Sequence, residues 1–322
     1  MRKLCGVMAV LLVCAIAGFP SQALAADVRV LVTELNNGIL DFGDFRSGDK
    51  LIVVGNGQLN ATGWRTLKDE TDVKGLSFSL VLENGQTSIP NEAMRGNTML
   101  TSITGAQVTS VGEWAFSRSG LKSVSMPMLE TVQNNAFFSC FALESFYLPQ
   151  VKIIGWQAFE NNTSLKVISL PAATTVGRLA FMNSSSVTEL TLLSVENIGN
   201  QAFANCTELK VLRLGNADPS VSEDAFEGVG PLSIYSNKNR LRSSNYPAGS
   251  RLLTSTDTSG GSGCDAMTAN AGLWLLLCVA LFLTTLTGPG NIWLQSMPAQ
   301  KVANVIIPYL PAKSDSGSGD GN

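Results

Sequence analysis

Short stretches of alternating apolar and polar residues recur along the middle of this chain. Each follows the pattern Leu-x-x-Leu-x-Leu, with another apolar residue at some of the leucine positions. Alternation with a period of two predicts a strand that buries one side. Proline ends three of the stretches, at Pro127, Pro149 and Pro171. The apolar positions of five stretches are Leu121, Val124, Met126; Leu143, Phe146, Leu148; Leu165, Ile168, Leu170; Val187, Leu190, Leu192; and Leu209, Leu212, Leu214.

A second pattern recurs in phase with these strands, at intervals of 21–23 residues. It is an alanine followed by a large apolar residue, at Ala93-Met94, Ala115-Phe116, Ala136-Phe137, Ala158-Phe159, Ala180-Phe181, Ala202-Phe203 and Ala225-Phe226. A β-branched residue stands four positions before each alanine, at Ile89, Val111, Val132, Ile154, Val176, Ile198 and Val221. Self-similarity at this period predicts stacked structural repeats, with the six phenylalanines in one interior row.

Glycine follows the β-branched residue in four repeats, at Gly112, Gly155, Gly177 and Gly199. The expected reason is a backbone turn with positive φ, which other residues adopt at a cost. One repeat of 22 residues buries too few apolar side chains to fold alone, so stability must come from stacking. A strand, a turn and the segment that leads back to the next strand together form one coil of a solenoid.

The motif Ile-Gly-x-x-Ala-Phe-x-x-Cys-x-x-Leu-x-x-Leu-x-Leu-Pro resembles the bacterial surface leucine-rich repeat family of the BspA or Treponema type, and residues 198–214 carry all of it except the final proline. The resemblance implies an α/β fold: a right-handed leucine-rich repeat solenoid with a parallel sheet on one side. It comprises about seven repeats over residues 76–240, with small capping segments. The resemblance also implies an exported protein with a binding or adhesion role.

Both ends of the solenoid need caps. We expect an N-terminal cap over residues 26–75 and a C-terminal cap from 236 to about 253, which the last strand at 232–235 leads into. The N-terminal segments are expected to be a strand at 28–35, a turn at 36–38, extended chain at 39–45 and 51–54, and a helix at 60–73 leading into a strand at 76–82.

The N-terminus has the pattern of a secretory signal peptide over residues 1–25. Arg2 and Lys3 precede an apolar run, and Ala23-Leu24-Ala25 predicts cleavage after Ala25. A retained membrane anchor is the alternative. The protein is therefore expected to be exported and to act at the cell surface or envelope.

Residues 265–287 form a long apolar segment near the other end, long enough to cross a bilayer as a helix. A buried core helix is the alternative. A Gly/Ser/Thr linker at 254–264 ends in Cys264, and a polar tail covers 288–322. Gly-rich chain, cysteine and hydrophobic helix resemble the sorting signals of Synergistes-type bacteria, which implies attachment or processing at Cys264. The tail departs from that signal because it lacks a basic cluster. We expect membrane anchoring through 265–287, or processing and release.

Composition narrows the chemistry. The chain has no histidine, which excludes Ser-His-Asp and Cys-His nucleophiles and histidine metal ligands. A net charge of -3 argues against a nucleic-acid partner. No cofactor, metal or small-molecule substrate is expected. Cys140 and Cys206 lie three repeats apart, roughly 14 Å at the strand spacing, so they are expected to be buried free thiols rather than a disulfide.

Two further features follow from the repeat. Asn161, Asn183 and Asn205 share one position on adjacent repeats and are expected to form a hydrogen-bonded ladder. The side chains between the core positions of each strand are expected to face solvent: Ser102 and Thr104, Ser123 and Ser125, Ser145 and Tyr147, Val167 and Ser169, Glu189 and Thr191, and Val211 and Arg213.

This polar face predicts binding of a protein or extended polymer on a host or neighbouring cell surface. Tyr147 and Arg213 are the best anchors by residue type. The remaining candidate contacts are Ser125, Ser169, Glu189 and Thr191.

Two other functions compete with this interpretation. The repeats of an envelope protein can self-associate into a surface layer. A glycosidase would need paired carboxylates, and Glu144 and Glu189 are two repeats apart, about 10 Å or more. That separation is at or beyond the widest such mechanisms use, so we predict that the protein is not an enzyme.

Overall fold

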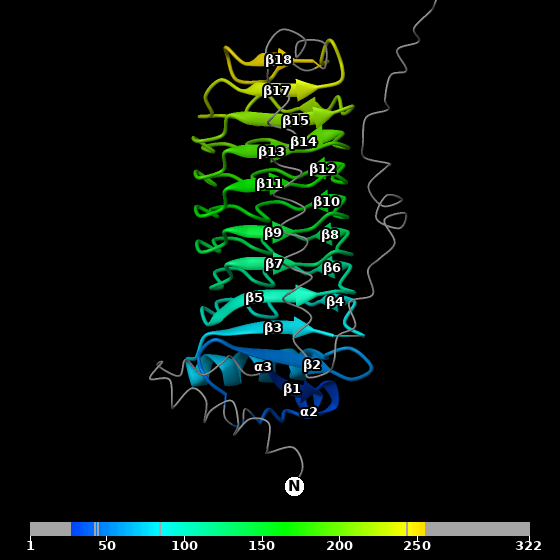
Figure 1. Ribbon diagram of the computed structural model, residues 1–322, viewed down its shortest axis with the longest axis vertical. Helices are drawn as coiled ribbons and strands as arrows, with labels where there is room; N and C mark the ends of the chain where they lie inside the picture. The colour runs from blue at the N-terminus through cyan, green and yellow to red at the C-terminus, as the bar shows by residue number, and fades with distance from the viewer. Residues whose placement is uncertain (1–26, 42, 44, 84, 243, 255–322) are drawn as a thin grey trace, which may run out of the picture. The chain divides into compact units, whose positions relative to one another are not determined.

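The computed structural model describes residues 27–254, except residues 42, 44, 84 and 243. Parallel strands are stacked one above another from β1 to β18 (Figure 1). The predicted signal peptide with Ala25, the linker with Cys264, the apolar segment 265–287 and the tail 288–322 lie outside the described residues. Within residues 27–254, no helix has the length and apolar character needed to cross a bilayer.

The larger sheet is made of one strand from each coil, and every neighbouring pair that is bonded runs parallel. Six strands form its first segment: β1 (Asp27–Leu31), β2 (Asp49–Val54), β3 (Phe78–Leu82), β5 (Leu100–Gly105), β7 (Ser123–Ser125) and β9 (Ser145–Tyr147). Five form the second: β11 (Val167–Ser169), β13 (Glu189–Thr191), β15 (Val211–Gly215), β17 (Ser233–Ser236) and β18 (Arg251–Leu253).

The β-branched positions form a second parallel sheet, which the sequence pattern did not predict. Each strand is two residues long: β4 (Ser88–Ile89), β6 (Ser110–Val111), β8 (Thr131–Val132), β10 (Ile153–Ile154), β12 (Thr175–Val176), β14 (Asn197–Ile198) and β16 (Ser220–Val221). A coil therefore consists of a long strand, a turn, a short strand and a second turn. The fold is the predicted solenoid of leucine-rich repeats.

The interior row of phenylalanines is confirmed. Phe116, Phe137, Phe159, Phe181 and Phe203 are all completely buried, and Phe226 is almost so. Ring centroids of successive members lie 5.2, 4.9, 5.1, 5.5 and 5.4 Å apart, with planes within 14° of parallel. These distances are close to the separation of neighbouring strands, so each ring packs on the next at the pitch set by the backbone.

The expected role of the four repeat glycines is wrong. None of Gly112, Gly155, Gly177 and Gly199 has positive φ. A Cβ on Gly155 would lie 2.7 Å from the backbone carbon of Gln133 in the preceding coil, and the other three glycines are similarly close to backbone. Glycine is present because adjacent coils approach too closely for a side chain.

The left-handed backbone lies instead at two other positions, which recur in most of the turns. One is the residue before the repeat alanine, such as Gln157 (φ 54°) and Leu179 (φ 59°). The other is two residues after the phenylalanine, where Asn161 and Asn183 have φ of 62° and 61°. Asparagine tolerates this conformation better than most residues, which accounts for its recurrence there.

Polar ladders run beside the apolar row. The predicted asparagine ladder is confirmed, because Asn183 donates to Asn161 and Asn205 donates to Asn183, both over 2.9 Å. One residue further along, the buried side chains of Cys140, Asn162, Ser184 and Cys206 donate to the carbonyl oxygens of Phe116, Phe137, Phe159 and Phe181 in the coil before. Cys140 and Cys206 are thus buried free thiols, as predicted.

The larger sheet is interrupted between β9 and β11, which lie side by side without strand pairing. The central core position of β9 holds Phe146, whereas β7 and β11 hold the smaller Val124 and Ile168 there. Phe146 is only partly buried, and its ring is tilted 38° against that of Phe159 at 5.2 Å. We attribute the interruption to this larger side chain, which does not fit the space that an aliphatic residue fills in neighbouring coils.

The N-terminal cap matches the expectation in part. The strand expected over 28–35 ends at Leu31, and helix α2 (Val32–Asn36) follows, burying Val32 and Leu35 one turn apart. The extended segment expected at 51–54 is part of β2, whereas no strand forms over the described residues of 39–45.

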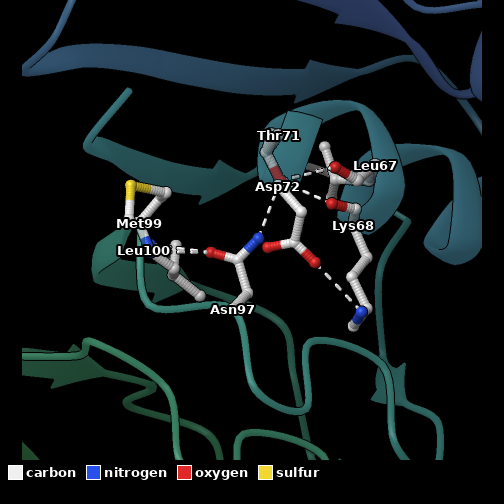
Figure 2. Close-up of polar contacts among 7 residues, drawn as sticks. All are labelled: Leu67, Lys68, Thr71, Asp72, Asn97, Met99 and Leu100. Carbon is white, nitrogen blue, oxygen red and sulfur yellow. Dashed lines mark hydrogen bonds and ion pairs between the residues drawn. The ribbon is translucent and has the colours of Figure 1, made fainter. Parts of the chain in front are cut away.

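Helix α3 (Ala61–Lys74) begins after the N-cap Asn60 and ends at Gly75, as predicted. It packs against the first repeat coil, while β1 and β2 extend the larger sheet beyond that coil. Asn97 of the first coil donates to the Thr71 hydroxyl over 2.8 Å, and that hydroxyl donates in turn to the Leu67 and Lys68 carbonyls (Figure 2). The Asn97 carbonyl oxygen accepts from the Met99 and Leu100 amides, which orients the side chain. Asn97 occupies the same repeat position as Cys140 and Asn162. In the first coil, the side chain at this position thus binds the capping helix.

The C-terminal cap carries one strand that the sequence did not reveal. β17 starts where expected, and β18 then pairs with it in parallel register, with Ile234 opposite Leu252. Phe226 contacts Tyr246 with ring centroids 5.9 Å apart, so the aromatic row ends on a residue of the cap.

Candidate binding face

The outward side chains of β5 to β17 form the face that the sequence predicts as a binding surface, and we call it the sheet face. Strand register aligns them in two columns, although pairing is absent between β9 and β11. The Ser102 column continues through Ser123, Ser145, Val167, Glu189, Val211 and Ser233. The Thr104 column continues through Ser125, Tyr147, Ser169, Thr191, Arg213 and Tyr235.

All these side chains are exposed or half-buried, so the predicted orientation of the strands is confirmed. The columns are formed mostly of serine and threonine, which provide hydrogen-bond donors and acceptors without charge. Ser125, Ser169 and Thr191 are half-buried between their column neighbours. They form a flat polar surface from which the larger side chains of Tyr147 and Arg213 project.

Arg213 is the most constrained charged residue of the sheet face. Its Nε lies 2.5 Å from the Glu189 carboxylate, which stands diagonally across from it on β13. Its guanidinium also lies over the Tyr235 ring on β17, 4.7 Å from the centroid. The side chains of Arg213 and Glu189 are only 28% and 26% exposed. Held from both sides, the guanidinium loses little freedom when a partner contacts it.

Tyr235 was not predicted as a site residue. Its position was available from the sequence, because it lies 22 residues after Arg213 in the same repeat column. The aromatic ring presents a face for the arginine, an arrangement favourable to a cation. Glu189, Arg213 and Tyr235 therefore form one cluster across three adjacent coils, which we call the arginine cluster.

Tyr147 lies elsewhere on the face, beside the sheet interruption. It is 47% exposed on β9, and Val167 on β11 is 48% exposed. Three coils separate Tyr147 from Arg213, with Ser169 and Thr191 between them in the column. The structure does not bring the two predicted anchors together, so a partner contacting both must extend along the stack.

The two carboxylates considered for glycoside hydrolysis differ in their surroundings. Glu189 is paired with Arg213, whereas Glu144 precedes β9 and is exposed. Among the residues that the structure describes, no group of three or more His, Cys, Asp or Glu side chains is placed to hold a metal ion.

The fold and face define a class of protein, a parallel β-solenoid of leucine-rich repeats with an open polar sheet surface. The sequence profile described as the BspA type leucine rich repeat region matches this chain in six copies, over residues 77–188 and 174–246. These matches cover more than half of the chain, and the protein belongs to this family.

Solved structures with similarity to this chain include bacterial leucine-rich repeat proteins. A leucine rich cell surface protein from Faecalibacterium prausnitzii is 15% identical, covering 71% of this chain and 78% of its own, with a TM-score of 0.33. The pneumococcal vaccine antigen PcpA is 13% identical, covering 70% and 86%, with a TM-score of 0.35. A leucine-rich repeat protein from Eubacterium ventriosum is 14% identical, covering 56% and 90%, with a TM-score of 0.21. No curated protein matches the chain.

Proposed function

We propose that this protein binds a macromolecular partner, a protein or extended polymer on a host or neighbouring cell surface, through the sheet face. The observation that carries the proposal is the arginine cluster. A guanidinium held by both a carboxylate and an aromatic ring is an anchor prepared before the partner arrives.

The arrangement of the anchors indicates the shape of the partner. Tyr147 and Arg213 lie three coils apart, roughly 14 Å at the strand spacing, on a surface that is otherwise serine and threonine. A small molecule cannot reach both, whereas an extended chain or a protein surface can. The leucine-rich repeat family is in keeping with a binding role of this kind.

The test replaces each anchor by the residue type that its own column uses in other coils. Tyr147→Ser and Arg213→Thr together restore an uninterrupted Ser/Thr column without removing a buried side chain. The full-length protein and this double variant are compared for binding to an immobilised extracellular-matrix extract and to whole cells. We expect at least a tenfold loss of affinity, because aromatic and arginine anchors dominate such interfaces.

The matched control changes an aromatic residue and an arginine on another surface. Trp156 and Arg178 occupy the same repeat position, two residues after the short strand of the second sheet. Other coils carry Asn134 and Asn200 at this position. Trp156→Asn with Arg178→Asn should therefore leave binding unchanged. Equal binding by both double variants, or an equal loss in both, would show that the sheet face is not the binding site. Concentration-dependent self-association abolished by the Tyr147/Arg213 pair would instead favour the envelope-layer function.

The proposal extends to the location of the protein. We propose export through the signal peptide at 1–25 and tethering through 265–287, with Cys264 as the attachment point. The sequence patterns described above support this arrangement. N-terminal sequencing of the envelope fraction should begin at Ala26, and Cys264→Ser should release the protein into the medium. An intact N-terminus, or unchanged retention of the variant, would contradict it.

A further inference from the structure

A second candidate site lies away from the sheet face, between the capping helix and the first two coils. It is a cavity of about 740 Å³, within the 300–1,000 Å³ of typical ligand sites. Helix α3 provides Trp64, Arg65 and Lys68, and the turn after β4 provides Arg95. Arg118 of the next coil completes the lining on that side. We call this cavity the cap pocket.

The charge of the cap pocket differs from that of the whole protein. Four of its lining residues are cationic and one, Glu92, is acidic, although the chain carries a net charge of -3. Arg95 is paired with Glu92 at 2.9 Å, and Lys68 with Asp72 at 3.0 Å. Arg65 and Arg118 have no ion pair among the described residues. Two guanidinium groups therefore remain available to an anion.

Arg118 departs from the residue type that its repeat position favours. The same position holds Ser139 in the next coil and the asparagine ladder of Asn161, Asn183 and Asn205 in the three coils after that. The ladder supplies its own hydrogen bonds, so an arginine there adds nothing that the solenoid needs. Arginine replaces the ladder residue only in the coil that borders the cap pocket.

A buried donor provides an independent observation. Trp64 lines the cap pocket and is 2% exposed, and its indole N–H has no hydrogen-bond partner among the described residues. An indole nitrogen can only donate, and an unpaired buried donor is costly. The first turn of α3 carries no acidic residue, and Ala61 and Trp64 of that part of the helix line the cap pocket. The unpaired indole donor and the two unpaired arginines favour an acceptor with negative charge.

The rest of the lining indicates which anion fits. Leu59, Ala61 and Pro90 supply apolar contact, while Ser88 and Asn91 supply partners for hydroxyl groups. A sugar ring presents both C–H surface and hydroxyls, and an acidic sugar adds a carboxylate or sulfate for bidentate guanidinium contacts. We propose that the cap pocket binds a carboxylate- or sulfate-bearing saccharide.

The experiment is calorimetric titration of the full-length protein with a sulfated uronic-acid disaccharide. We expect saturable binding that weakens with added NaCl, and no binding of a neutral disaccharide of the same size. Arg65→Gln and Arg118→Gln should each lower the affinity about tenfold, because each removes a charged donor. Both side chains are exposed, so both variants should fold, and circular dichroism of each variant is the check.

The matched control is Arg178→Gln, which removes an exposed cation from a distant coil. The Arg178→Gln variant should bind the acidic disaccharide with the same affinity as the unmodified protein. Trp64→Phe, which retains an aromatic ring, should weaken binding several-fold by removing the indole donor. An equal loss in Arg178→Gln, or no binding of the acidic disaccharide, would overturn the proposal. So would binding of inorganic sulfate or of a tri-glutamate peptide as tightly as the disaccharide.

Discussion

Replacing Phe159 by alanine perturbs the interior row at its most crowded point. The ring is completely buried and stacks on Phe137 at 4.9 Å and on Phe181 at 5.1 Å. Phe146 also contacts it, at 5.2 Å. The substitution thus removes contacts to the coil on each side and leaves a cavity between them.

The expected cost follows from these contacts. Truncating a buried phenylalanine to alanine costs about 3–5 kcal/mol in transfer and cavity terms. Ring pairs contribute about 0.5–1.5 kcal/mol each beyond burial. Phe159 loses two stacked partners, so we expect a loss near 5 kcal/mol in the free energy of unfolding.

The measurement is urea unfolding of the full-length protein, followed by circular dichroism and by tryptophan fluorescence. Phe141→Ala is the control, because Phe141 is 58% exposed and its loss should change stability by no more than about 0.5 kcal/mol. A loss below about 1.5 kcal/mol for Phe159→Ala, or one equal to the control, would refute the reasoning.

Three further predictions concern the backbone, the cap and the thiols. Gly155→Ala should destabilise by about 1–3 kcal/mol in the same unfolding assay, because its Cβ meets backbone at 2.7 Å, while Gly230→Ala, with open space around it, should not destabilise. Thr71→Val leaves the Asn97 amide without its acceptor and should cost about 1–3 kcal/mol, with faster hydrogen exchange in α3. Burial raises the pKa of Cys206 to about 12, so ionisation of the unfolded thiol should lower stability as pH rises above about 8.5. Its replacement by serine, which keeps a donor, should make unfolding less dependent on pH in that range; an unchanged slope would contradict this.

The sequence predicts the solenoid because its strongest signals are repeated in every coil. The phenylalanine row, the asparagine ladder and helix α3 each follow from spacing, capping residues and residue type. Repetition averages out local ambiguity, since a mistaken interpretation of one coil is contradicted by the next.

Features that depend on distances between coils could not be predicted in this way. The sequence shows that Gly155 is unusual but not that neighbouring backbone excludes a Cβ there. Two-residue strands are too short to show a period, so the second sheet was missed. The strand expected over 28–35 ends early because the apolar residues from Val32 onward also fit one turn of helix, with Val32 and Leu35 on the same side.

The candidate sites also differ in how far the repeat pattern alone predicts them. The columns of the sheet face were predictable, and extending the register by one coil would have added Tyr235. The ion pair between Glu189 and Arg213 depends on a diagonal contact between strands. The cap pocket depends on how α3 docks on the first coils, which no periodic pattern specifies.

The most direct test of the account compares two double-mutant cycles in the unfolding assay. Phe137 and Phe159 are neighbours in the row, whereas Phe116 and Phe203 are separated by three rings. If each coil is stabilised by the next, the Phe137/Phe159 cycle should show a coupling energy of about 0.5–3 kcal/mol, and the distant cycle should be additive within about 0.5 kcal/mol. Additivity in both cycles would contradict a stacked interior row.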